Sequence, residues 1–262
     1  MLESPAAVLE RRGPIAVITL NRPGALNAVN GALSTAAGLA LDEFARDREL
    51  RVAVITGAGR AFCAGADLKA LAAGERIHAE GHEEWGFAGL VKHFVDKPVI
   101  AAVNGFALGG GTEIMLACDL AVLADDAKLG LPEVKRGLAA AAGGLLRLPR
   151  QIPLKLALGV VLTGEPIDAA TAARWGLVNR VVPAAEVLDT ALELAARIAA
   201  NAPLPVRASK RVAYRAADFG ADWSDELWEM NAAELGPVFR SGDAREGARA
   251  FAEKRTPQWR GE

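Results

Sequence analysis

The sequence predicts an α/β protein that ends in a helical region. Short apolar runs rich in β-branched residues, typical of buried strands, recur at Val52–Thr56, Val99–Val103, Leu120–Ala124 and Val178–Val182. Segments with helical periodicity separate these runs along the chain. From Asn201 onward no further strand pattern occurs. These observations indicate the fold class, but a doubly wound sheet and other α/β arrangements fit them equally well.

Composition narrows the possible functions. The chain has 262 residues, of which 52% are hydrophobic and 24% charged, so it can bury a sizeable core in one large domain, with or without an appendage. A net charge of −2 gives no electrostatic footprint for a nucleic-acid partner. The most apolar region, Pro98 to Ala124, contains Asn104, Glu113 and Asp119, which makes it a poor membrane span and a good buried core.

The cysteines, the histidines and the first residues bear on location and cofactors. Cys63 and Cys118 lie in apolar or Gly/Ala-rich surroundings and do not indicate a disulfide framework, which favours a reducing compartment. Residues 1–5 show no basic stretch followed by an apolar one, so no signal peptide is expected and the protein is predicted to be cytoplasmic. The three histidines follow no metal-ligand spacing, and no metal site is predicted.

The remaining elements can be predicted in chain order. Ala7–Arg12 and Ile15–Leu20 flank Gly13-Pro14 and predict a β-hairpin. Asn27–Leu50 predicts a helix, while residues 71–96 are polar and mixed and predict a mobile surface segment. The later part of the chain predicts helices at Leu145–Arg150, Pro153–Leu162, Asp168–Trp175, Pro183 onward, Leu204–Ala217, Trp223–Leu235 and Asp243–Lys254. In the last of these, Asp243 and Glu246 form a capping-box-like pair.

The stretch from Val103 to Glu133 carries the strongest functional signal. Gly109-Gly110-Gly111 opens a predicted helix, so its first N–H groups are bare and the helix dipole there favours negative charge. An enzyme that holds an oxyanion needs this arrangement, although a triple glycine is also compatible with a simple tight turn. Glu113 stands among apolar residues, where a carboxylate must be paired or have a raised pKa. Glu133 follows Pro132 and fits either a catalytic role or an ordinary helix start.

A second loop, Phe62 to Lys69, leads from a strand-like run into a helix. It fits a plain strand-to-helix turn with Asp67 near the helix start. It also fits a site in which the N–H of Ala66 faces the glycine-rich helix.

These segments together resemble the crotonase family, also called the enoyl-CoA hydratase/isomerase superfamily. The similarity runs from Leu20-Asn21-Arg22-Pro23 to Phe251–Arg255, nearly the whole chain. The pieces that carry it occur in order and at matching spacing: Leu26-Asn27-Ala28, Phe62–Leu68, Pro98–Gly105, Ala107–Glu113, Leu131-Pro132-Glu133, Gly143-Gly144 and Leu162-Thr163-Gly164.

The resemblance implies a fold, an assembly and a substrate class. It implies a spiral of ββα units over residues 1–200, with the coenzyme A and acyl site, and a helical region over residues 201–262 that builds homotrimers or dimers of trimers. The substrate would be an acyl-CoA thioester. No metal or redox cofactor would be required, and coenzyme A would be part of the substrate.

The resemblance also implies roles for individual residues. Ala66 and Gly110 match the two backbone donors of the family's oxyanion hole, and Glu113 and Glu133 match the two glutamates of its hydratases. The coenzyme A contacts would come from two segments, at Ala25, Leu26, Ala64, Asp67 and Leu68.

The implied activity is that of an enoyl-CoA hydratase, which adds water across the 2,3 double bond of a trans-2-enoyl-CoA. The region around Lys135-Arg136-Gly137-Leu138 is similar to the carnitinyl-CoA dehydratase-like branch of the family. An enoyl-CoA isomerase and a non-catalytic acyl-CoA binding protein remain alternatives. The chain departs from the family pattern at Gly24, where a basic residue is common, and at Ala140–Ala142, where a proline is usual. The sequence leaves open which glutamate is the base and which acyl chain is used.

Overall fold

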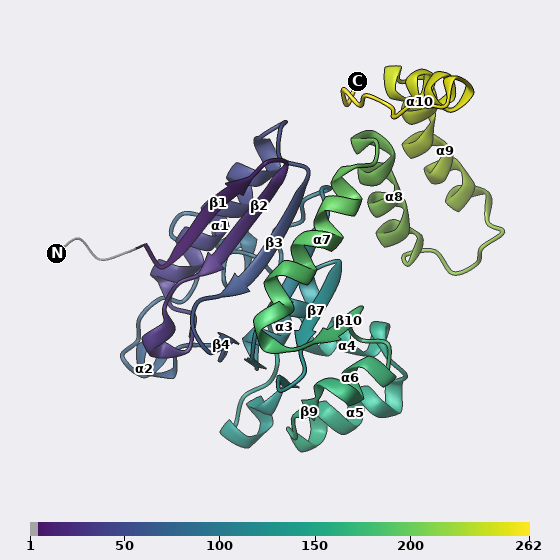
Figure 1. Cartoon of the computed structure of the whole chain (residues 1–262). Helices are drawn as coiled ribbons and strands as arrows, with labels where there is room; N and C mark the ends of the chain where they lie inside the picture. The colour runs from purple at the N-terminus through teal and green to yellow at the C-terminus, as the bar shows by residue number, and fades with distance from the viewer. Residues whose placement is uncertain (1–4) are drawn as a thin grey trace.

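In the computed structural model, which describes residues 5–262, ten strands form two sheets (Figure 1). The first four residues, on which much of the signal-peptide prediction rests, lie outside the described range. Strands β1 (Ala7–Arg12) and β2 (Ile15–Leu20) pair antiparallel, which confirms the predicted hairpin.

The larger sheet has the strand order β1-β2-β3-β5-β7-β10, and all neighbours after the hairpin are parallel. Its members after the hairpin are β3 (Val52–Gly57), β5 (Val99–Val103), β7 (Leu120–Ala124) and β10 (Arg180–Val182). Every residue of β3 and β5 is buried, which explains their unbroken apolar sequences. Helix α1 (Gly31–Arg46) lies behind the sheet and α7 (Val187–Ala199) crosses in front of it (Figure 1).

The smaller sheet, with strand order β4-β6-β8-β9, sets the architecture. Strands β3, β5 and β7 are each followed by a strand of this sheet, and β4, β6 and β8 again pair in parallel. Each pair of strands then leads into a helical segment, so the chain repeats a ββα unit that advances along both sheets. This repeat is the spiral that the family resemblance implied. The strands are β4 (Ala61–Cys63), β6 (Phe106–Leu108), β8 (Lys128–Gly130) and β9 (Ile167–Asp168).

Local side-chain hydrogen bonds set the start of α1. Helix α1 begins later than predicted because Asn27 has a φ of +56° and uses its buried amide to donate to the carbonyls of Ala58, Ala61 and Phe62. Asn30 then caps the helix by accepting from the Leu33 N–H. The other body helices are α2 (Leu68–Ala72), α3 (Gly110–Ala117), α4 (Gly144–Gln151), α5 (Leu154–Thr163) and α6 (Ala169–Arg174).

The predicted surface segment, residues 71–96, is mostly exposed up to Glu84, whereas most of its second part is buried; its mobility stays a prediction. The segment has little regular structure beyond the end of α2 and the 3-10 turn η2 (Glu83–Trp85), and two of its large apolar side chains, Leu71 and Phe94, are exposed. The apolar side chains that are buried lie mainly in its second part: Trp85, Phe87, Ala88, Leu90, Val91 and Val95. The Trp85 ring is sandwiched between the rings of His82 and His93, at centroid distances of 3.8 and 4.4 Å.

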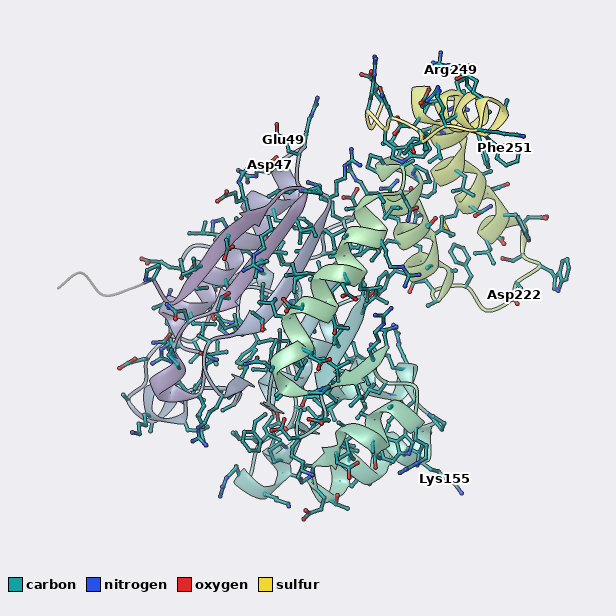
Figure 2. The ribbon with its side chains drawn as sticks, in the orientation of Figure 1. Asp47, Glu49, Lys155, Asp222, Arg249 and Phe251 are labelled. Atoms are coloured by element: carbon teal, nitrogen blue, oxygen red, sulfur yellow. The ribbon has the colours of Figure 1, made fainter. Side chains whose placement is uncertain are left out.

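Residues 203–253 form a helical arm that extends away from the body (Figure 1). The arm contains α8 (Pro203–Ala216), α9 (Asp225–Phe239) and α10 (Gly242–Glu253), as the sequence predicted. The Phe251 side chain projects from α10 (Figure 2). No helix within residues 5–262 is both long enough and apolar enough to cross a membrane.

The predicted capping pair in α10 is wrong. Ser241 caps the helix by accepting from the Ala244 N–H. Asp243 is buried and accepts from the N–H groups of Arg260 and Gly261, at 2.8 and 2.9 Å. Glu246 accepts from Arg255 and from the N–H of Gln258. Both carboxylates therefore fasten the C-terminal segment to α10.

Candidate active site

The start of α3 is closely packed on all three of its glycines. A Cβ added at Gly110 would overlap the Phe87 ring, and one at Gly111 would overlap the carbonyl oxygen of Cys63. Gly109 has a φ of +55°, and a Cβ there would lie 3.0 Å from Oε1 of Glu133. The triple glycine is therefore required by close approach of three neighbours, which a simple tight turn would not need.

Two backbone donors lie together at this helix start. Gly65, with a φ of +93°, approaches so closely that an added Cβ would be 3.2 Å from the Gly110 nitrogen. Val29 pairs with the backbone on both sides of Ala66, so the Ala66 N–H points away from that bridge. Within residues 5–262, neither the Ala66 N–H nor the Gly110 N–H donates a hydrogen bond to the chain. Both remain available for an anionic oxygen, where the dipole of α3 adds to the attraction.

Glu113 lies in the first turn of α3 with its side chain directed at the next helix. The residue is 3% exposed, and its Oε1 accepts from the Gly144 N–H at 2.8 Å. Burial raises the pKa of Glu113 to about 7, and the charge of Glu133 acts in the same direction against the opposing Gly144 bond. The carboxyl can thus exchange a proton near neutral pH.

Glu133 approaches the same helix start from the 3-10 turn η3 (Pro132–Arg136). Pro132 at the first position confirms the expected helix start. Burial raises the pKa of the Glu133 carboxyl. Its Oε2 is buried and has no hydrogen-bond partner among residues 5–262. Since buried oxygens are normally hydrogen-bonded, this atom is expected to bond to a water or a substrate.

The predicted coenzyme A segments meet at a hollow of about 580 Å³. Ala25, Asp67 and Leu68 line it, and the N–H of Ala64 donates to the Leu26 carbonyl at 3.0 Å beside it. The Asp67 carboxylate accepts from Arg22 at 2.9 Å and caps α2. Because its carboxylate is already paired, Asp67 is more readily available to a ligand through its backbone than through its charge.

The structure adds two residues that the sequence analysis did not select. Phe87 covers Gly110, and Arg147 on α4 lies against Gly143. Arg147 is a basic residue between Leu146 and Leu148, and this pattern could have marked it. Nothing local distinguishes Phe87. Among the described residues, no group of three or more His, Cys, Asp or Glu side chains could hold a metal ion.

The comparison with known proteins gives the family. The model of the family described as "Enoyl-CoA hydratase/isomerase" matches residues 10–262. The chain belongs to the enoyl-CoA hydratase/isomerase family. It is 47% identical over 256 residues to a carnitinyl-CoA dehydratase of Salmonella arizonae, with 97% of each chain covered.

Solved structures agree with this membership and with the spiral fold. An enoyl-CoA hydratase from Mycobacterium tuberculosis H37Rv matches with a TM-score of 0.93 at 46% identity, covering 99% of this chain and 100% of that one. A carnitinyl-CoA hydratase from Mycobacterium avium is 57% identical with a TM-score of 0.80 and the same coverage.

Proposed function

We propose that this family member is a hydro-lyase that interconverts a 2-enoyl-CoA thioester and its 3-hydroxyacyl-CoA. The observation that carries the proposal is the meeting of two carboxyls, the buried Glu113 and the part-buried Glu133, with two free N–H groups at the start of α3. An isomerase of the same family needs only one carboxylate base. The raised pKa and unpartnered oxygen of Glu133 favour the two-carboxylate chemistry.

The chemistry follows from where charge develops. When the oxygen of water bonds to C3 of the enoyl group, electrons of the C2=C3 bond move onto the thioester oxygen. The N–H groups of Ala66 and Gly110 would stabilise that oxyanion more than the neutral carbonyl, which is the requirement for acceleration. One glutamate takes the proton of the water, and a carboxyl group returns a proton to C2. The reverse sequence removes water.

The hollow beside the site supports a proposal for where the coenzyme A part of the substrate binds. We propose contacts from Ala25, Leu26, Ala64, Asp67 and Leu68, since these residues line or adjoin the hollow. The names of the relatives make carnitinyl-CoA a candidate substrate, assayed in the dehydration direction. Straight-chain enoyl-CoA thioesters of increasing length are the alternative class, and a panel containing both distinguishes them.

The decisive experiment replaces each glutamate by glutamine. Gln keeps size and hydrogen bonding but cannot exchange a proton, so Glu113→Gln and Glu133→Gln should each lower the hydration rate by at least about a hundredfold. If the two act on one water, the double variant should lose little more. The rate is followed by the loss of absorbance of the conjugated double bond.

The matched control is Glu186→Gln, which changes an exposed glutamate on the surface turn η4 (Ala184–Glu186). It should retain the full rate. Retention of hydration by Glu133→Gln would reject the two-carboxylate mechanism and favour an isomerase-like mechanism with Glu113 as its one base. Absence of hydration across the whole panel by the unaltered protein would favour an acyl-CoA binding role.

We also propose that residues 201–262 form the assembly region of a homotrimer or a dimer of trimers in the cytoplasm. Large apolar side chains exposed on the arm support assembly. The free, buried Cys63 and Cys118 are compatible with a reducing compartment.

A further inference from the structure

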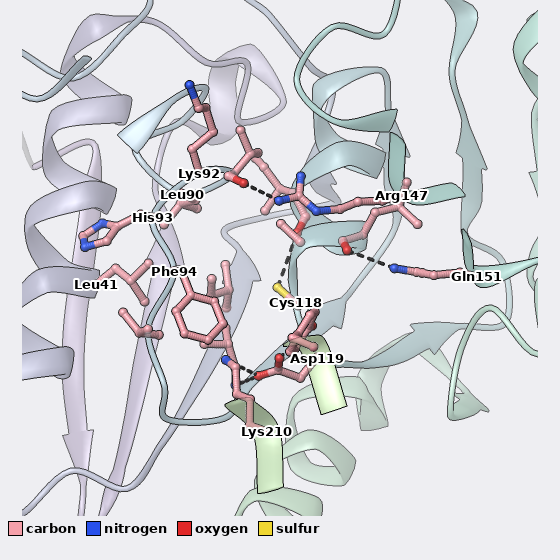
Figure 3. Close-up of a pocket in the computed structure, with 18 of the residues that line it drawn as sticks. Leu41, Leu90, Lys92, His93, Phe94, Cys118, Asp119, Arg147, Gln151 and Lys210 are labelled. Atoms are coloured by element: carbon pink, nitrogen blue, oxygen red, sulfur yellow. Dashed lines mark hydrogen bonds and ion pairs between the residues drawn. The ribbon is translucent and has the colours of Figure 1, made fainter. Parts of the chain in front are cut away.

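Arg147 turns its side chain back along its own helix. A Cβ added at Gly143, the residue before α4, would overlap Nη1 of Arg147, so the guanidinium lies on the face of that glycine. Its Nη2 donates to the carbonyl oxygen of Val91 at 2.6 Å. Figure 3 shows the guanidinium reaching the backbone between Leu90 and Lys92, at the edge of a cavity of about 400 Å³.

The first contact of Arg147, at Gly143, lies next to the N–H group that binds Glu113. Gly143 caps α4 with a φ of +109°, and the N–H of the following Gly144 is the group that binds Oε1 of Glu113. A Cβ at Gly144 would lie 3.1 Å from the same oxygen, so the turn and the carboxyl have no free space between them. A movement of this turn would therefore move the carboxyl of Glu113.

The second contact of Arg147, at Val91, lies close to Phe87, which covers the proposed oxyanion site. The Val91 N–H donates to the carbonyl of Phe87 at 3.2 Å, and the Phe87 ring packs on Gly110. One guanidinium thus joins two segments that are more than fifty residues apart in sequence. One segment holds the Glu113 carboxyl, and the other covers the Gly110 backbone.

We propose that Arg147 is a positioning residue for the hydration reaction. By joining the Gly143-Gly144 turn to residues 87–91, Arg147 holds the Glu113 carboxyl in a fixed position relative to the Gly110 N–H. The inference rests on the proposed function. Within residues 5–262, Arg147 forms no hydrogen bond or ion pair with either glutamate or the predicted coenzyme A segments, so its removal should change the rate and not the substrate affinity.

The charge of Arg147 affects the pKa of Glu113, and a side chain that acted only through packing would have no such effect. Burial raises the pKa of Glu113, the charge of Glu133 raises it further, and the Gly144 N–H and the Arg147 charge lower it. Removal of the guanidinium should therefore make Glu113 titrate at a higher pH. The other charged or titratable groups around the cavity are Lys92, His93, Cys118, Asp119, Arg150, Lys210 and Tyr214.

The test compares Arg147→Gln with Arg150→Gln, an exposed arginine one turn later on α4. Arg147→Gln loses the bond to Val91 that holds the Gly143-Gly144 turn, so it should lower kcat by roughly tenfold or more with little change in KM. The pH limb that reports Glu113 should move to higher pH. Guanidinium ion should restore part of the rate of Arg147→Ala. Arg150→Gln should match the unaltered enzyme in kcat, in KM and in the position of the Glu113 pH limb.

A second measurement needs no activity. Carbon-13 spectra of protein labelled at its glutamate carboxyls should show one resonance that disappears in Glu113→Gln and titrates at higher pH in Arg147→Gln. A folded Arg147→Gln with unchanged kcat, pH profile and Glu113 titration would overturn the proposal. If that variant unfolds, Arg147→Lys decides: it keeps the charge but cannot make both contacts, and an unchanged kcat would equally reject the role.

The two proposals fail separately. If the unaltered protein hydrates nothing, the proposed function fails, and the Glu113 titration in Arg147→Gln still shows whether the guanidinium acts on the carboxyl. If the unaltered protein is active and Arg147→Gln matches it, only the role of Arg147 fails.

Discussion

Glu113 reduces the stability of the fold when it ionises. Its folded pKa of about 7 is raised above the usual 4.5 by burial and by Glu133, whereas an unfolded chain would titrate near the usual value. Between these pH values the folded state binds the extra proton, so stability falls as pH rises from about 4.5 to 7 and stays lower above that. The shift corresponds to roughly 3 kcal/mol.

Glu113→Gln should therefore be more stable than the unaltered protein at pH 8, and the difference should nearly disappear at about pH 4, below the lower end of this window. Chemical denaturation at the two pH values measures this change. Glu186→Gln, at an exposed position, should follow the unaltered protein at both. An identical pH dependence in Glu113→Gln and the unaltered protein would show that Glu113 does not carry the titration.

At the scale of single residues, the sequence predicted candidate reacting groups but not the residues that hold them in place. A carboxylate surrounded by apolar residues and a glycine run at a helix start are local features, so Glu113 and Gly110 could be selected from the sequence. The roles of Phe87 and Arg147 depend on contacts with Gly110 and Val91, which lie 23 and 56 positions away. No local pattern states such a contact.

At the scale of elements, the first turn of α3 is fixed by excluded volume. Gly111→Ala would place a methyl group on the Cys63 carbonyl oxygen, which belongs to β4 and cannot move freely. Overpacking of this kind typically costs 1–3 kcal/mol, and the variant should lose activity because α3 carries both Gly110 and Glu113.

Gly159 in α5 is the matched control for this glycine. An added Cβ there meets nothing within 4 Å, so Gly159→Ala should stabilise the protein by about 0.5–1 kcal/mol through better helix propensity, without effect on activity. In denaturant unfolding, the two variants should change the free energy of unfolding in opposite directions. A stable and active Gly111→Ala would contradict the close packing of α3 on β4.

The elements that the sequence missed are the strands of the smaller sheet. Strands β4, β6 and β8 have three residues each and lie next to glycine-containing loops, so they give no periodic pattern to detect. Strands β3, β5 and β7 were predictable because burial on both faces requires continuous apolar residues. Without the short strands, the residues alone could not separate a spiral from a doubly wound sheet, and the family resemblance supplied that step.

At the scale of the whole molecule, the arm is fastened to the body mainly by charges. Asp96 accepts from Arg207 and Arg211 of α8, and Asp119 accepts from Lys210 at 2.7 Å. Glu234 of α9 pairs in turn with Arg211. These bonds define how α8 leaves the body, while the two outer helices and the turn before α9 present large apolar side chains to solvent: Trp223, Trp228, Phe239 and Phe251.

This exposure leads to the last prediction, that the chain assembles through its arm. Phe239 and Phe251 are 75% and 88% exposed, and burying such side chains yields roughly 1.5–3 kcal/mol each. Light scattering should give a mass at least three times the 27.3 kDa of one chain. Replacing Phe239 and Phe251 together by Asp should lower that mass without unfolding the body, whereas Glu229→Lys, a charge change at an exposed position of α9, should not. A monomeric unaltered protein at micromolar concentration would contradict assembly, and an unchanged mass in the double variant would exclude these two side chains from the interface.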